Sequence, residues 1–376
     1  MSNHPRQSDS KPVIRAAMLG CGRVAAHYRF MLLETDPVPS LRIVACCDRI
    51  AARAEECAAA FQCPAYTCFE TMMRNEALDV VLVLTPSGTH FELARSALEH
   101  DLHALVEKPI TLRPEQALEL KRLAQHKRRC CATVFQNRYN PAVRAVRSAL
   151  ERGRFKKLVS ISVRLRWCRY QSYYDDPWHG QWAQDGGVTS QQAIHHLDAA
   201  RWLGGPVERV TAFMTNRLNA LEAEDTLVGI MEFRCGALGT IEATTAARPS
   251  DMEASLSIVG EGGTVQIGGI ALNQIVQWQF VEPDPSDEDA EQAFSETVPS
   301  AYGLSHSRLI RDFADALQQG RPVAPVSIDE ALPTIELVHA LYASVESGAE
   351  VSLQDRPRSK RLGIAPSRAP DSPVTA

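Results

Sequence analysis

The sequence lacks any long run of apolar residues. Its most apolar stretches, such as residues 80–84 (VVLVL), are far shorter than the roughly 20 residues that a membrane-spanning helix needs. The first residues (MSNHPRQSDSKP) contain no apolar core of the kind found in secretory signals. These absences predict a protein without a membrane partner that works in the cytoplasm.

The sequence also lacks a strong excess of charge of one sign. Its 40 Lys and Arg residues and 45 Asp and Glu residues give a formal net charge of -5. A balance so close to neutral gives no electrostatic reason to bind nucleic acid or an anionic lipid surface. We therefore expect a small-molecule partner and no nucleic-acid partner.

No Cys-x-x-Cys pair occurs among the ten cysteines. Cys46 and Cys47 are adjacent, as are Cys130 and Cys131, and both pairs lie in apolar segments where a free cysteine acts as a small hydrophobic residue. Disulfides are also rare in a reducing compartment. The sequence therefore predicts buried thiols and no metal site.

The first third of the chain alternates short apolar runs with Ala-rich segments of helical spacing. Apolar strands separated by helices indicate a parallel sheet that is covered on both faces. The pattern predicts a doubly wound α/β domain over residues 12–133, preceded by a disordered segment, residues 1–11. The expected strands are residues 14–20, 41–47, 80–84, 103–106 and 130–135, with helices at residues 50–61 and 91–100 between them.

From Asn140 onward the pattern changes to strands that follow one another without intervening helices. A chain of 376 residues is too long for one ordinary core, and this change marks a second domain. We expect an α+β domain with a large, mostly antiparallel sheet over residues 134–352, and a disordered Pro- and Ser-rich tail over residues 353–376. The expected strands are residues 158–168, 207–215, 226–233, 238–245, 254–259 and 270–280, and the expected helices are residues 141–152, 191–203, 305–319 and 328–347.

A dinucleotide-binding motif lies where the first strand meets the first helix. Residues 20–25 (GCGRVA) fit the pattern G-x-G-x-x-G/A, in which Gly20 permits a tight turn and Gly22 lets the backbone approach a pyrophosphate. Asp48 ends the second strand, where an acidic side chain meets the ribose diol. Its charge favours NAD over NADP, and Arg49 beside it keeps NADP open as the alternative.

Further segments resemble a known enzyme family. Glu107-Lys108-Pro109 follow the strand at residues 103–106, residues 85–90 (TPSGTH) follow the strand at residues 80–84, and residues 186–198 (GGVTSQQAIHHLD) lie downstream. This set is similar to the glucose–fructose oxidoreductase / inositol dehydrogenase / MocA (Gfo/Idh/MocA) family over about residues 12–352. The closest resemblance within it is to the 3-dehydrogenases of UDP-N-acetylglucosaminuronic acid, carried by residues 134–141 (VFQNRYNP), 166–170 (RWCRY), 178–182 (WHGQW) and 190–196 (SQQAIHH).

The resemblance implies that Lys108 and His195 are the catalytic residues. The family's Asp, four residues before the His, is Gln191 here, which removes a charge near the base. Asn and Gln are usual around this position in the sugar-nucleotide subgroup. We assign the cofactor contacts to Gly20, Gly22, Arg23, Val24, Asp48, Arg49, Thr85, Pro86, His90, Glu107, Lys108 and Gln136.

The chemistry of these two residues can be argued without the family. When a hydride leaves a secondary alcohol for nicotinamide, the hydroxyl proton must leave as well, and a histidine is the natural base near neutral pH. A nearby lysine cation then stabilises the negative oxygen. When each residue is considered alone, however, the simpler interpretation is that Lys108 is a solvated surface lysine and His195 a buried core histidine.

The substrate is expected to contact arginine and amide side chains of the second domain. Arginine forks suit a diphosphate or a carboxylate, and aromatic faces suit a sugar or a uracil. Tyr173, Tyr174 and Trp182 could supply such faces. For any single arginine, a solvated strand edge or a subunit interface is the competing interpretation. The substrate set that we assign is Lys108, Arg138, Arg169, Gln191, Gln192, His195 and His196.

The sequence thus predicts an NAD-dependent oxidoreductase that oxidises a secondary hydroxyl, C3 being the first candidate, of a sugar or a sugar nucleotide. Two alternatives stay open. One is an NAD-assisted glycosidase that works by oxidation, elimination and reduction. The other is a regulator that binds a dinucleotide without catalysis. The family resemblance also implies a homodimer or a homotetramer.

Overall fold

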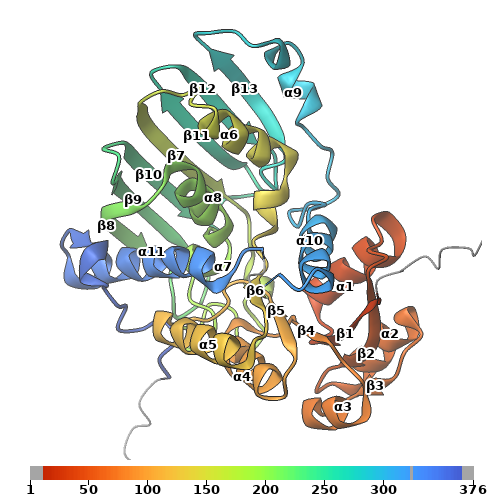
Figure 1. The fold of residues 1–376 in the computed structure, drawn as a ribbon. Helices are drawn as coiled ribbons and strands as arrows, with labels where there is room; N and C mark the ends of the chain where they lie inside the picture. Colours follow the sequence, from red (N-terminus) through yellow and green to blue (C-terminus); the bar gives the residue numbers. More distant parts are fainter. Residues whose placement is uncertain (1–11, 322–324, 366–376) are drawn as a thin grey trace, which may run out of the picture.

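The computed structural model describes residues 12–321 and 325–365, and these residues form two sheets with their covering helices (Figure 1). No helix among these residues is long and apolar enough to cross a membrane. The segments 1–11 and 366–376, which were expected to be disordered, lie outside the described residues. Residues 353–365 correct the prediction of a tail that is disordered from residue 353. Leu362 is buried there, and the backbone N–H of Ser359 donates to Nδ1 of His339 at 3.0 Å.

The N-terminal sheet is entirely parallel, with the strand order β3-β2-β1-β4-β5-β6, so the predicted doubly wound domain is confirmed. β4 is apolar throughout and β5 is apolar after His103, because helices cover both faces of the sheet. The strand order reverses between β1 and β4, which creates a crevice at their carboxyl ends. The elements are β1 (Ile14–Leu19), α1 (Arg23–Arg29), β2 (Leu41–Cys47), α2 (Ala51–Phe61), β3 (Ala65–Tyr66), α3 (Phe69–Asn75), β4 (Val80–Val83), α4 (His90–Glu99), β5 (His103–Val106), α5 (Pro114–Lys127) and β6 (Cys131–Thr133).

The C-terminal sheet has eight strands in the order β13-β12-β11-β7-β10-β9-β8-β14. It is mostly antiparallel, as predicted, and only β7 and β10 pair in parallel. α6, α8 and α11 pack against one face of it (Figure 1). The elements are α6 (Pro141–Glu151), β7 (Leu158–Arg166), α7 (Val188–Gln191), α8 (Ile194–Gly204), β8 (Val207–Thr215), β9 (Thr226–Phe233), β10 (Leu238–Thr244), β11 (Glu253–Gly260), β12 (Gly263–Gly268), β13 (Gln274–Phe280), α9 (Ala290–Ala293), α10 (His306–Gln318), α11 (Ile328–Ser347) and β14 (Val351–Ser352).

Two predicted elements differ from the structure by more than two residues at one end. The strand expected at residues 270–280 begins only at Gln274, as β13, because Gly269 and Leu272 both have a positive φ and turn the chain between β12 and β13. The strand β12 itself was not predicted. The helix expected at residues 191–203 begins three residues earlier and is interrupted between α7 and α8. The N–H groups of Gln192 and Ala193 both donate to the carbonyl oxygen of Val188 at this break.

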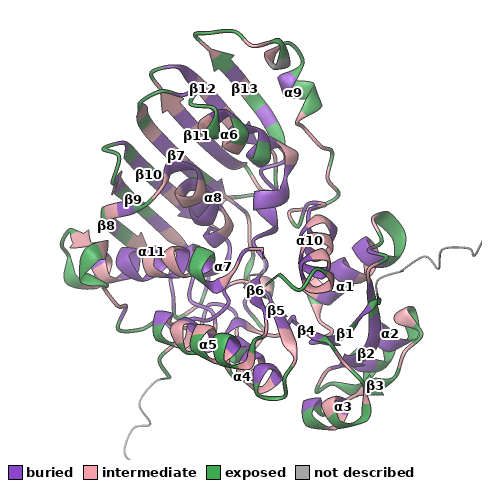
Figure 2. Ribbon diagram, in the orientation of Figure 1, coloured by how far each residue is buried: buried purple, intermediate pink, exposed green. Residues whose placement is uncertain are grey.

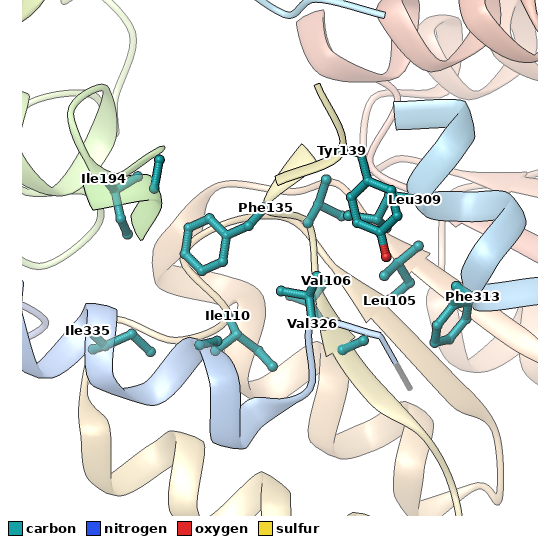
Figure 3. Close-up of a cluster of buried hydrophobic side chains, with 14 of the residues drawn as sticks. Leu105, Val106, Ile110, Phe135, Tyr139, Ile194, Leu309, Phe313, Val326 and Ile335 are labelled. Atoms are coloured by element: carbon teal, nitrogen blue, oxygen red, sulfur yellow. The ribbon is translucent and has the colours of Figure 1, made fainter. Parts of the chain in front are cut away.

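The hydrophobic core is continuous between the two domains. Figure 2 shows buried residues along the central strands of both sheets. Figure 3 shows the part where they meet, with Val106, Phe135, Ile194, Leu309 and Ile335 gathered in one cluster. Val106 precedes Glu107 and Lys108, and Ile194 precedes His195. The core therefore fixes the backbone on both sides of the candidate site.

Candidate active site

A cavity of about 1550 Å³ lies over the carboxyl ends of the N-terminal strands and is closed from the other side by the second domain. The first domain contributes the ends of β1, β2, β4 and β5. The second domain contributes α7, the start of α8, the segment after β7 and the loop before α10. Of the residues assigned from the sequence, the following line it: Gly20, Gly22, Arg23, Val24, Asp48, Arg49, Thr85, Pro86, His90, Glu107, Lys108, Gln136, Arg169, Gln191, Gln192 and His195.

The loop between β1 and α1 has the geometry that its glycines predict. Gly20 has φ +94°, and a Cβ there would lie 2.7 Å from the carbonyl oxygen of Leu84, so a side chain is excluded. A Cβ on Gly22 would meet nothing within 4 Å, which leaves open space in front of this backbone. Asp48 accepts hydrogen bonds from the N–H groups of Cys21 and Ile50, each at 2.8 Å, and thereby ties the end of β2 to the loop.

Lys108 stands at the end of β5 and reaches across to the second domain. Its Nζ donates to the backbone carbonyl of Gln191 at 2.7 Å and also to Oε1 of that side chain. Burial lowers the pKa of Lys108, and the negative charges of Glu107 and Asp185 oppose this shift. The amide at position 191 thus contacts the lysine directly but cannot neutralise its charge.

His90 and Glu107 position the turn that carries Lys108. The buried ring of His90 lies between the carbonyl oxygens of Thr85 and Pro109, at 2.8 and 2.7 Å. Glu107 accepts a hydrogen bond from the Tyr28 hydroxyl at 2.9 Å and one from the backbone N–H of Lys108 at 3.2 Å. Burial raises the pKa of Glu107 and lowers that of His90.

His195 lies on α8, one helical turn after Gln191. Its ring makes an edge contact with Phe135, with 6.1 Å between the ring centroids. Nδ1 is buried without a hydrogen-bond partner among the described residues, so Nε2 is the nitrogen available to the cavity. Burial, followed by the positive charge of Lys108, brings the pKa of His195 well below 6.5. The imidazole is therefore neutral at neutral pH.

The structure separates the predicted substrate residues into two groups. Arg169 lines the cavity, pairs with Asp251 at 3.0 Å and lies over the Trp167 ring. Gln192 also lines it, and its amide nitrogen donates to the Tyr173 hydroxyl at 3.3 Å.

Arg138 and His196 lie outside the cavity, which corrects their assignment as substrate contacts. The guanidinium of Arg138 is buried and forms a fork with Asp198, with both N···O distances at 2.7 Å, and it also pairs with Glu330. A buried arginine with carboxylate partners holds the core together rather than binding a ligand. His196 is 1% exposed and packs edge-on against Trp167. Tyr174 and Trp182 do not line the cavity either.

Sequence reasoning placed residues of the segment 173–182 beside the substrate but missed that this segment closes over the dinucleotide loop. Arg23 pairs with Asp176 at 3.0 Å and lies over the Tyr173 ring, and His179 also contacts Asp176. Trp178 stacks on His179 and lines the cavity. The aromatic and acidic run at residues 173–182 (YYDDPWHGQW) is the signal in the sequence that could have indicated this cover.

Among the described residues, no group of three or more His, Cys, Asp or Glu side chains is placed to hold a metal ion. The ten cysteines are free thiols, and five of them are buried, including Cys46, Cys47, Cys130 and Cys131.

Two family models match the chain, one over each domain. The model described as the NAD-binding Rossmann fold of an oxidoreductase family matches residues 14–135, and the model of that family's C-terminal alpha/beta domain matches residues 147–353. The chain belongs to the Gfo/Idh/MocA oxidoreductase family. This member is thus an NAD-dependent oxidoreductase, which confirms the predicted family, enzyme class and cofactor.

Solved structures similar to this Gfo/Idh/MocA member include two WlbA dehydrogenases, each in complex with NADH and UDP-GlcNAcA. The one from Chromobacterium violaceum is 30% identical with a TM-score of 0.84, covering 94% of this chain and 99% of its own. The one from Bordetella pertussis is 32% identical with a TM-score of 0.84, covering 92% and 99%. Among curated relatives, the D-glucoside 3-dehydrogenase of Escherichia coli is 26% identical over 360 residues, which is 90% of this chain and 97% of that protein.

Proposed function

We propose that this enzyme oxidises a secondary hydroxyl, at C3, of a sugar nucleotide such as a UDP-N-acetylhexosaminuronate, and that it works in the cytoplasm. The observation that carries the proposal is the convergence of Lys108 and His195 on the cavity that also contains the dinucleotide loop. The two residues come from different domains. The likeness to the WlbA dehydrogenases over almost the whole chain supports the choice of substrate.

The residues around the first domain's crevice fit NAD. The open space in front of Gly22 admits a pyrophosphate close to the backbone, next to the N-terminus of α1. Asp48 lines the cavity at the end of β2, where its carboxylate can accept hydrogen bonds from a ribose diol. When bound, NAD supplies the acceptor for the hydride.

The two candidate catalytic side chains have different roles in the proposed reaction. Neutral His195 takes the hydroxyl proton on Nε2, because Nδ1 is buried. Two of the three hydrogens on the Lys108 ammonium are donated to Gln191, which leaves one for the substrate oxygen. Its charge stabilises negative charge on that oxygen as the proton leaves.

The second domain provides the groups for the rest of the substrate. Arg169 can pair with a phosphate or a carboxylate, because only one of its terminal nitrogens is engaged by Asp251. Trp167 and Tyr173 offer aromatic faces in the same cavity, and Gln192 adds an amide.

The test is to follow NADH absorbance after NAD is added to the purified protein with UDP-GlcNAcA. UDP-GlcNAc, which lacks the carboxylate, and free glucuronate serve as matched comparisons. We expect NADH to form with UDP-GlcNAcA and more slowly with the other two compounds. Release of an alcohol without net NADH would instead identify an NAD-assisted glycosidase. No turnover with any compound of a broad sugar panel would identify a non-catalytic regulator.

The role proposed for Asp48 predicts a change in cofactor preference. Asp48→Asn keeps an acceptor for the Cys21 N–H but removes the negative charge. A hydrogen bond to a charged group contributes about 1.5 kcal/mol or more, so the ratio of kcat/KM for NAD over NADP should fall by about tenfold or more. Steady-state kinetics with both cofactors measure this ratio. An unchanged ratio in a variant with the wild-type Tm would remove Asp48 from cofactor selection.

We further propose that the chain forms a homodimer or a homotetramer through the open face of the C-terminal sheet. On this face, Phe213 of β8, Val228 and Ile230 of β9 and Leu238 of β10 are 77%, 51%, 60% and 62% exposed. The strand register places Phe213 opposite Val228, and Ile230 lies on the same face of β9, two residues after Val228. An apolar patch of this kind is typical of a subunit interface.

The open face can be tested by placing charge on it. Ile230→Glu is expected to shift the protein to a monomer in light scattering coupled to size-exclusion chromatography, because the interface would have to bury a carboxylate. Leu218→Glu is the matched control, since Leu218 is 58% exposed but lies after β8, outside the sheet. A wild type that is already monomeric would contradict the proposal, as would equal effects of the two variants.

A further inference from the structure

Asp185 is a buried carboxylate that the mechanism above leaves unused. It lies just before α7 and is 1% exposed. Oδ1 accepts a hydrogen bond from the Ser87 hydroxyl at 3.3 Å, whereas Oδ2 has no hydrogen-bond partner among the described residues. An ionised carboxylate in such a place is costly unless a nearby positive charge compensates it.

The positive charge that acts on this carboxylate is that of Lys108. Ser87 follows β4 and Lys108 follows β5, and these strands are parallel neighbours, so their carboxyl ends lie together. The two acceptors of the Lys108 ammonium are the oxygens of Gln191, and both are neutral. Glu107 is also near, but its oxygens already accept hydrogen bonds from Tyr28 and from the Lys108 backbone.

We propose that Asp185 is a positioning residue that keeps the Lys108 ammonium charged, by supplying the negative charge that Gln191 cannot provide. Asp185 does not line the cavity and need not touch the substrate. It acts on the proposed dehydrogenation only through the lysine, so its catalytic consequence rests on the function proposed above.

The titration of the surrounding groups agrees with this arrangement. Burial raises the pKa of Asp185 to about 7, and the charge of Lys108 opposes the rise. Burial lowers the pKa of Lys108, opposed by Glu107 and then by Asp185. The other titratable groups that face the pair are His90, Tyr173, Tyr174, Asp176, His179 and His195. Above about pH 7 Asp185 is ionised, and its negative charge then favours the protonated form of Lys108.

The direct test measures the lysine without any substrate. The rate at which acetic anhydride acetylates Lys108 is followed against pH by peptide mass spectrometry, since only the neutral amine reacts. In Asp185→Asn the midpoint is expected to fall by about one pH unit, because the neutral side chain no longer stabilises the ammonium. Adding Gln191→Glu to this variant places a carboxylate in contact with Lys108 and should move the midpoint back up.

Glu224→Gln is the matched control. Glu224 is also buried, has one oxygen without a partner and packs against Gly187 near α7, but its bonded oxygen accepts from Thr189 and Tyr342. Its removal should change the Tm without moving the midpoint for Lys108. If Asp185→Asn does not fold, Ser87→Ala provides a second test of the proposal. It removes a donor that favours the Asp185 carboxylate, so it should lower the Lys108 midpoint in the same direction.

An unchanged midpoint in folded Asp185→Asn would overturn the proposal, as would an equal shift in Glu224→Gln or no recovery with Gln191→Glu. In the active enzyme, the alkaline limb of kcat against pH should follow the acetylation midpoint. If acetylation responds as expected but no sugar is oxidised, Asp185 has its assigned role and the proposed reaction is wrong. The two proposals can therefore fail separately.

Discussion

Replacing Lys108 with methionine is expected to lower kcat by about 10²–10³-fold, the usual loss when one preorganised donor to a developing oxyanion is removed. Methionine keeps the length and the apolar stem but has no charge and no N–H. The two contacts to Gln191 disappear as well, and with them the link between β5 and α7. Stopped-flow single turnovers with NAD and the sugar nucleotide measure the chemical step directly.

Lys121→Met is the control for the loss of a lysine. Lys121 lies on α5, pairs with Asp329 at the surface and is remote from the cavity, so its replacement should leave kcat unchanged. Lys108→Met should still bind NADH. Turnover within a few-fold of the wild type in Lys108→Met would show that this ammonium does not stabilise the substrate oxygen.

Replacing His195 with alanine is expected to lower kcat by about 10²–10⁴-fold, which is the contribution of a well-placed general base. The variant should be slower in the step that removes the proton, whereas its affinity for the cofactor should not change. Fluorescence titration with NADH should therefore give nearly the wild-type Kd. Wild-type turnover in this variant would remove His195 from the mechanism.

His196→Ala provides the matched control for His195. His196 is the next residue on α8 but packs against Trp167 outside the cavity. Its replacement should lower the Tm through lost packing and leave the kcat of the folded protein close to that of the wild type. If His196→Ala loses as much turnover as His195→Ala, the reaction depends on the intact packing of α8 and not on the His195 imidazole alone.

The shifted pKa values set the pH range in which these residues act. A base must be neutral, and burial lowers the pKa of His195, so the acidic limb of kcat/KM should lie below pH 6.5. An electrostatic donor must be protonated, and burial lowers the pKa of Lys108, so the alkaline limb should lie below pH 10.5. Lys108→Met should lose the alkaline limb and His195→Ala the acidic one.

The dinucleotide-binding part of this site could be predicted from short segments of the sequence. Gly20 is needed because the chain turns with a positive φ against Leu84, and this requirement is visible in the spacing of the motif. Glu107 and Lys108 follow β5, and Asp48 follows β2. The apolar runs of these strands predict a parallel sheet, and the carboxyl ends of parallel strands meet at one edge. Such features depend on neighbours along the chain, so they could be predicted.

Packing between distant segments decided what each polar side chain of the second domain does. Arg138 and Arg169 are both assigned as substrate residues from the sequence, with Arg169 the preferred one. In the fold, Arg138 is buried against Asp198 and Glu330, while Arg169 lies in the cavity. The partner of a charge is set by which segments fold together, and no local pattern contains that information.

The sequence by itself predicted the two domains, the cofactor and, through the family resemblance, Lys108 and His195 as the catalytic residues. Only the tertiary structure decided that Gln191 contacts Lys108, that residues 173–182 cover the dinucleotide loop and that Asp185 is buried. The reason is physical. Backbone periodicity and glycine geometry act over a few residues, whereas burial and charge act through space between segments that the fold alone brings together.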